Sequence, residues 1–90
     1  MNSKTEQLAE ALDRVGAALE SCGEQHWAGW LRGDAARLRS GDLSGISHFL
    51  GAFGGMGSLN DISVPYDDPI QKEIDEAHSL AKALARHHGL

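Results

Sequence analysis

The chain has 90 residues, the length of one domain, so residues 1–90 are treated as a single domain. It carries 8 Lys and Arg against 13 Asp and Glu, and this net charge of −5 argues against a nucleic-acid binder, which usually presents a basic face. No apolar run approaches the ~20 residues of a transmembrane helix, and the amino terminus lacks the pattern of a signal peptide. We therefore expect a small, acidic, cytoplasmic globular protein.

The first predicted element is an amphipathic helix. Apolar residues recur at intervals of three and four from Leu8 to Cys22, and Ser3 followed by Glu6 has the pattern of a capping box. Gly23 is expected to end the helix. Cys22, the only cysteine, excludes an internal disulfide and is expected to be a buried, inert thiol at the end of the apolar stripe.

The second predicted helix covers residues 24–40 and ends before Gly41. It carries Trp27 and Trp30 at helical spacing, and these are the largest hydrophobic side chains of the chain. We expect both tryptophans in the core, although tryptophan also serves as an anchor in protein interfaces.

A third, shorter helix is predicted over residues 42–53, with Asp42 as its cap. The glycines that follow break the helical pattern, and residues 59–64 alternate in a way that leaves room for one short extended segment. We interpret the segment as a structural loop whose polar side chains hold backbone amides; its residues are Gly54, Gly55, Gly57, Ser58, Asn60 and Asp61.

The last predicted helix begins at Pro69, after Asp68 as N-cap, and ends at Gly89. Its apolar residues repeat at intervals of four and three from Ile70 to His88. The sequence thus predicts an all-α protein, a small bundle of about four helices with a glycine-rich loop. We expect the first and last helices to pack on the helix that carries the tryptophans.

The sequence contains little that predicts catalysis. None of the five histidines has the spacing of a zinc-binding helix motif, and the glycine loop lacks the lysine of a phosphate-binding loop, so we expect no metal and no cofactor. An enzymatic or small-molecule function would centre on His48, Asn60 and Asp61, yet their spacing does not require them to converge. The chain is therefore expected not to be an enzyme.

The acidic residues are concentrated in one segment. Between residues 61 and 76 the chain has six acids and one lysine, so this segment alone carries a charge of −5. Acids at the start of a helix favour its dipole, but the excess extends beyond the first turn. We predict a surface for a basic partner, with a merely solvated face as the alternative. Its residues are Asp61, Asp67, Asp68, Glu73, Asp75 and Glu76.

Three strings, HWAGWL at 26–31, Gly41-Asp42 and LGAFGGMGSLND at 50–61, resemble a small, uncharacterised family of bacterial proteins. Its mark is a W-x-x-W/L helix followed by a GGMGS-L/F-ND loop. The similarity covers residues 20–65, and GGMGSLND is its most specific part. The resemblance implies a bacterial origin and supplies no catalytic residues. Because small acidic bacterial proteins of this sort are frequently antitoxin or immunity proteins, it favours that function.

The leading hypothesis is a non-catalytic protein-binding module, an immunity or antitoxin protein that occludes the basic active site of a bacterial toxin. A nuclease would suit best, since nuclease clefts are positive to hold phosphates. The alternative is a homodimer or larger homo-oligomer with a structural or regulatory role, paired through the first or last helix.

Overall fold

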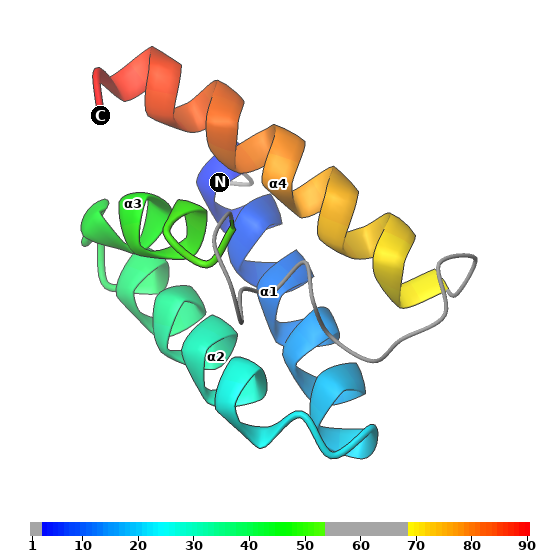
Figure 1. The fold of residues 1–90 in the computed structure, drawn as a ribbon. Coiled ribbons are helices and arrows are strands. Elements are labelled where there is room, and N and C mark those ends of the chain that lie inside the picture. Colours follow the sequence, from blue (N-terminus) through cyan, green and yellow to red (C-terminus); the bar gives the residue numbers. More distant parts are fainter. Residues whose placement is uncertain (1–2, 54–68) are drawn as a thin grey trace.

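The computed structural model describes residues 3–53 and 69–90, and these form four α-helices (Figure 1). The helices are α1 (Lys4–Ser21), α2 (Gln25–Arg39), α3 (Ser44–Leu50) and α4 (Pro69–His88). The all-α prediction is confirmed. The predicted glycine loop and extended segment lie outside the described residues. None of the described helices is long and apolar enough to cross a bilayer.

The pair α1 and α2 forms the centre of the bundle. The two helices run antiparallel and lie side by side (Figure 1), with more contacts between them than between any other pair of helices in the described residues. Gly16 permits this closeness, because a Cβ there would lie 3.2 Å from Cγ of Arg32 and 3.5 Å from the Ala28 carbonyl oxygen. A Cβ at position 16 would require the Arg32 side chain to shift by a few tenths of an ångström, whereas its contact with the Ala28 carbonyl oxygen would be an ordinary one.

The other two helices complete the core from different sides. α3 packs on α2, and α4 packs on α1 and α3. The expectation that the first helix packs on the tryptophan-bearing helix is confirmed, whereas the last helix has its main contacts with α1 and α3 instead. Helical spacing identifies the apolar face of a helix, but it does not say which neighbour covers that face.

One hydrophobic core joins all four helices. The predicted apolar stripe of α1 is buried from Leu8 to Leu19, and Trp27 is buried with it. The predicted stripe of α4 is buried from Ile74 to Leu84, whereas His88 at its end is exposed. The largest fully buried side chains are Phe49, Leu8, Leu12, Leu19, Leu31, Ile46, Val15 and Asp34.

The helix ends follow from local capping. The Ser3 hydroxyl accepts a hydrogen bond from the Glu6 amide at 3.1 Å, as the capping box predicts. Gly23 ends the turn after α1 at a φ of 84°, a conformation that favours glycine. α3 covers only Ser44–Leu50, so it is shorter than the predicted 42–53. Its N-cap is Leu43 rather than the predicted Asp42, although the Asp42 carboxylate accepts a hydrogen bond from the Ser44 amide at 3.0 Å.

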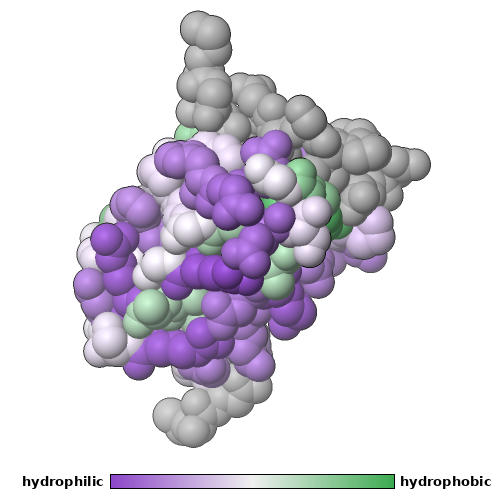
Figure 2. All heavy atoms as spheres, turned by 90° about the horizontal axis from the view of Figure 1, so that it is seen from below, coloured by the Kyte–Doolittle hydropathy of each residue, from purple (hydrophilic) through white to green (hydrophobic). Residues whose placement is uncertain are grey.

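The described surface is mainly hydrophilic. In the view of Figure 2, hydrophilic side chains dominate the described residues, and the hydrophobic areas between them are small. Leu90 is the one large hydrophobic side chain that is exposed among the described residues. The apolar stripes of the helices are thus buried in the core of the protein.

Two glycines make a matched test of the packing between α2 and α3. A Cβ at Gly45 would lie 3.0 Å from the Asp34 carbonyl oxygen, whereas one at Gly33 meets nothing within 4 Å. We expect Gly45→Ala to destabilise the protein by about 1–3 kcal/mol through overpacking. Gly33→Ala should stabilise it by about 1 kcal/mol through helix propensity. Urea unfolding measures both, and equal effects of the two substitutions would contradict this account of α2–α3 packing.

Candidate functional site

An aspartate lies in the core of the protein. Asp34 occupies a core-facing position of α2, since Trp27, Leu31, Asp34 and Leu38 recur at intervals of four, three and four. Its exposed fraction is 0%, and it is the one buried charged residue among those described. A buried carboxylate is costly unless hydrogen bonds compensate for the lost water.

That compensation comes through only one of the two carboxylate oxygens. Oδ1 of Asp34 lies 2.5 Å from Nδ1 of His48 and accepts a hydrogen bond at 3.2 Å from Nη1 of Arg37. Oδ2 is buried and has no hydrogen-bond partner in the described structure. An apolar residue at this position would avoid that cost, so folding alone does not account for the aspartate.

The electrostatics of the site reflect this imbalance. Burial raises the pKa of Asp34, and the hydrogen bond and charge of His48 and then of Arg37 oppose the effect without cancelling it. A buried carboxyl group with a shifted pKa and a specific partner is a recognised mark of functional sites.

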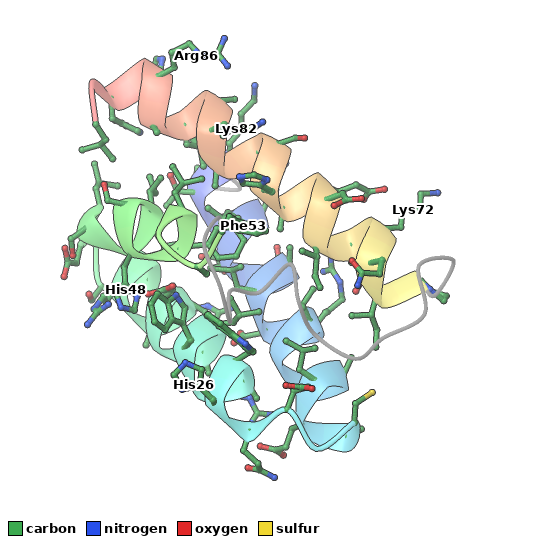
Figure 3. The ribbon with its side chains drawn as sticks, in the orientation of Figure 1. His26, His48, Phe53, Lys72, Lys82 and Arg86 are labelled. Carbon is green, nitrogen blue, oxygen red and sulfur yellow. The ribbon has the colours of Figure 1, made fainter. Side chains whose placement is uncertain are left out.

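An aromatic cluster holds His48 in place from α2. The rings of Trp30 and His48 stack with their centroids 4.2 Å apart and an interplanar angle of 17°. The indole Nε1 of Trp30 also donates a hydrogen bond at 3.2 Å to the His48 carbonyl oxygen. His26 meets Trp30 edge-on at 5.9 Å, and Figure 3 shows His26 and His48 on the same side of the protein. We call Trp30, Asp34, Arg37 and His48 the Asp34 cluster.

The Asp34 cluster connects the core with the surface. The side chains of His48 and Arg37 are 40% and 45% exposed. An ionised carboxylate only accepts hydrogen bonds, so Nδ1 of His48 donates to Asp34, and in the neutral imidazole the opposite nitrogen, Nε2, is then an acceptor. The arrangement therefore presents an oriented imidazole acceptor backed by an aromatic ring. No three His, Cys, Asp or Glu side chains in the described part of the chain are grouped so as to hold a metal ion.

The predicted acidic surface is only partly described. Glu73 forms an ion pair with Arg14 at 3.4 Å across the α1–α4 contact, so its charge is compensated. Glu76 is exposed beside the same contact, and Asp75 is exposed about 100° further around the helix. The structure thus brings Glu73 and Glu76 together but directs Asp75 elsewhere. The other acids of the prediction, Asp61, Asp67 and Asp68, lie outside the described residues.

The loop residues predicted as structural all fall in the segment that is not described, namely Gly54, Gly55, Gly57, Ser58, Asn60 and Asp61. The trio proposed for an enzymatic centre is therefore described only at His48.

The prediction for Cys22 is wrong, because this thiol is exposed. Cys22 is the C-cap of α1, where the chain leaves the helix, so the apolar periodicity no longer determines which way its side chain faces.

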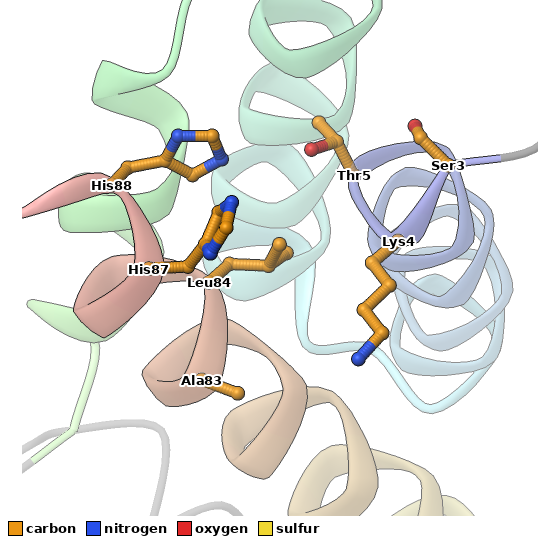
Figure 4. A pocket seen from close by; sticks show the side chains of 7 residues that line it. All are labelled: Ser3, Lys4, Thr5, Ala83, Leu84, His87 and His88. Atoms are coloured by element: carbon orange, nitrogen blue, oxygen red, sulfur yellow. The ribbon is translucent and has the colours of Figure 1, made fainter.

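Two further features lie apart from the Asp34 cluster. His78 of α4 stacks on Phe53 with ring centroids 3.8 Å apart, and burial, then the nearby Lys82, lowers the pKa of His78. A groove of about 560 Å³ separates the start of α1 from the end of α4 (Figure 4). Its lining residues are Ser3, Lys4, Thr5, Ala83, Leu84, His87 and His88.

Sequence reasoning singled out His48 but missed Asp34. The signal was present, because Asp34 interrupts the apolar register of Trp27, Leu31 and Leu38 with a charge. A charged residue at a core position of a helix needs a partner, and a histidine on the next helix was the candidate.

Comparison with known proteins adds one finding. A family model described as "Domain of unknown function (DUF6966)" matches residues 20–68, a range that contains α2, α3 and the whole Asp34 cluster. No curated protein and no solved structure matches the chain.

Proposed function

The chain belongs to the DUF6966 family, and from this premise we propose that it is a non-catalytic protein-binding module. In the more specific form of the proposal it is an immunity or antitoxin protein of the bacterial cytoplasm. It would neutralise a toxin by covering the toxin's basic active site, without a cofactor.

The observation that carries the proposal is which charged side chains form ion pairs within the chain. Arg14, Arg32, Arg37 and Arg39 each form an ion pair with a carboxylate of the same chain. Exposed acids such as Asp75 and Glu76 have no such pair within the described residues. Lys4, Lys72, Lys82 and Arg86 are also exposed without such a pair in the described residues, so the excess of acids over bases in the whole chain, a net charge of −5, is what leaves the surface negative on balance.

An uncompensated negative surface attracts a positive partner and speeds their encounter. A nuclease cleft carries positive charge to bind phosphates, so a nuclease toxin supplies the best complement. Since Leu90 is the one large hydrophobic side chain exposed among the described residues, charge and hydrogen bonding would dominate such an interface.

The test is charge reversal in the acidic segment. The partner is first captured with the tagged protein from a lysate of its own source cell and then purified. We expect the triple variant Asp67→Lys, Asp68→Lys, Glu76→Lys to associate with the partner about 10-fold more slowly at low salt, with a weaker dependence on ionic strength. Stopped-flow or surface-plasmon measurements of the association rate give both quantities.

Single reversals provide a matched control. Glu10 and Glu76 are both exposed helical glutamates without an ion pair in the described residues, on α1 and α4 respectively. Glu76→Lys should slow association more than Glu10→Lys. Equal association rates for the wild type and the triple variant would refute the electrostatic mechanism, and a partner without a basic surface would refute the immunity function.

The homo-oligomer remains the alternative proposal, with less support. This alternative requires pairing through α1 or α4, but the apolar stripes of both helices are buried inside the protein and are not available to a second copy. A mass that rises from monomer to dimer with concentration in analytical ultracentrifugation would favour it over the toxin-binding function.

A further inference from the structure

We propose that the exposed face of His48 is the site at which the protein receives an arginine side chain of its partner. This inference rests on the proposed function, because it presupposes a basic protein partner. Burying Asp34 costs folding free energy, and the inference gives a reason for that cost. Asp34 holds His48 as an oriented hydrogen-bond acceptor. Asp34 is in this sense a positioning residue, and His48 is the residue that makes contact.

The orientation of His48 comes from two sides. The 2.5 Å contact of its Nδ1 with Asp34 Oδ1 fixes the ring edge, and the stack on Trp30 at 4.2 Å fixes the ring plane. A carboxylate on Nδ1 also makes the opposite nitrogen a stronger acceptor, as it does for histidines that bind metals. No partner occupies Nε2 among the described residues, and the side chain is 40% exposed.

The chemistry of this face selects a planar donor. Trp30 stacks on one face of the imidazole, so a second planar group would have to stack on the opposite face of a side chain that is 40% exposed. A guanidinium group is planar, stacks on aromatic rings and carries five N–H donors, one of which can reach Nε2. A lysine ammonium donates hydrogen bonds but cannot stack as a plane.

The surrounding charges are compatible with a bound cationic side chain. Arg37 binds the same Asp34 oxygen as His48, and its charge is balanced by Asp34, to which it donates a hydrogen bond. With a neutral imidazole the Asp34 cluster is therefore electrically neutral, and the chain as a whole carries −5. Arginine is also among the residues most enriched at the centres of protein interfaces.

The experiment is an NMR titration of the full chain, labelled with ¹⁵N in its histidines, with Nα-acetyl-L-arginine amide at neutral pH. We expect the Nε2 signal of His48 to shift with a millimolar Kd, while the His78 signals stay in place. His78 is a suitable internal control, since it too is stacked on an aromatic ring but has no carboxylate hydrogen bond in the described structure. Nα-acetyl-L-lysine amide should bind at least about 5-fold more weakly.

The positioning role is tested with Asp34→Asn. This variant should weaken binding of the arginine amide about 5-fold, because an amide orients the ring without making Nε2 a stronger acceptor. His48→Gln, which keeps an acceptor and loses the ring, should lose the preference for arginine over lysine; because it lacks the His48 signal, its binding is followed through the backbone amide signals of α3 in a uniformly ¹⁵N-labelled chain, with the wild type measured in the same way. The comparison of the two amides on the wild type does not depend on whether any variant folds. For each variant, unchanged His78 signals show that it has folded.

Three results would overturn the inference: no shift of His48 with the arginine amide, an equal response to lysine, or full binding by Asp34→Asn. The titration also stands apart from the charge-reversal test. If charge reversal lowers the association rate but the His48 signal does not shift with the arginine amide, only the inference fails. If His48 binds arginine and charge reversal has no effect, the electrostatic part of the proposed function fails alone.

Discussion

Phe49→Ala is expected to remove most of the stability of the protein. Phe49 is 1% exposed, and its ring meets that of Phe53 edge-on at 5.2 Å. Removal of a buried phenylalanine side chain typically costs about 3–5 kcal/mol. A chain of this size has a total stability of the order of 5–10 kcal/mol, so a loss of this size is a large share of the total.

The reason for so large an effect is the shortness of α3. A helix of seven residues does not form alone in water, because nucleation is unfavourable, so packing must hold it in place. Phe49 and Ile46 are its main buried anchors. Without them α3 should separate from α2 and α4, and the contact between Asp34 and His48 should be lost with it.

Urea unfolding followed by circular dichroism measures the effect, and Phe49→Leu is the control. Leucine keeps most of the buried volume, so this substitution should cost less than about 2 kcal/mol. A loss below about 1 kcal/mol for Phe49→Ala would mean that α3 is not held by this side chain. The placement of the Asp34 cluster would then need another explanation.

The parts of the fold that the sequence predicted well are those that local patterns determine. The start of α1 follows from the Ser3 cap and its end from Gly23, whose φ of 84° favours glycine. The buried faces of α1 and α4 follow from helical periodicity alone. Contacts between helices are different, because any apolar stripe fits several neighbours. For that reason the position of α4 on α1 and α3 was not predictable from its own sequence.

The candidate site shows the same division. His48 was noticed because of its residue type, whereas its partner Asp34 lies 14 positions away on another helix. The ion pairs show it too: Glu10 lies four residues before Arg14, the spacing of a surface pair on one helix, yet Arg14 pairs with Glu73 of α4. Pairing across helices depends on which faces meet, and no single-helix pattern contains that information.

The second large effect concerns pH. Because burial raises the pKa of Asp34, the folded state binds its proton more tightly than the unfolded chain does. The contribution of Asp34 to stability is then fully present below the unfolded pKa of about 4 and is lost as the pH rises through the raised folded pKa. Relative to Asp34→Asn, the wild type should therefore lose stability as the pH rises above about 4. Each tenfold difference in proton affinity corresponds to ~1.4 kcal/mol.

The difference between wild type and Asp34→Asn isolates this one group. Asp42, for example, has the opposite tendency, because hydrogen bonds from Ser44 lower its pKa, but it contributes equally to both proteins. The measurement is urea unfolding at intervals from pH 4 to pH 8. Parallel stability profiles for the two proteins would show that Asp34 is not titrating in the interior as proposed.

His48→Gln sharpens the same experiment. The hydrogen bond and charge of His48 oppose the rise in the pKa of Asp34, so removing the imidazole should raise that pKa further and extend the loss of stability to higher pH. Replacing Asp34 by leucine should leave the protein at least as stable at pH 7, because Arg37 and His48 are half-exposed and can turn to water. If that variant is stable and yet no longer binds the arginine amide, then stability and recognition place opposite demands on position 34. That result would explain the buried aspartate by recognition.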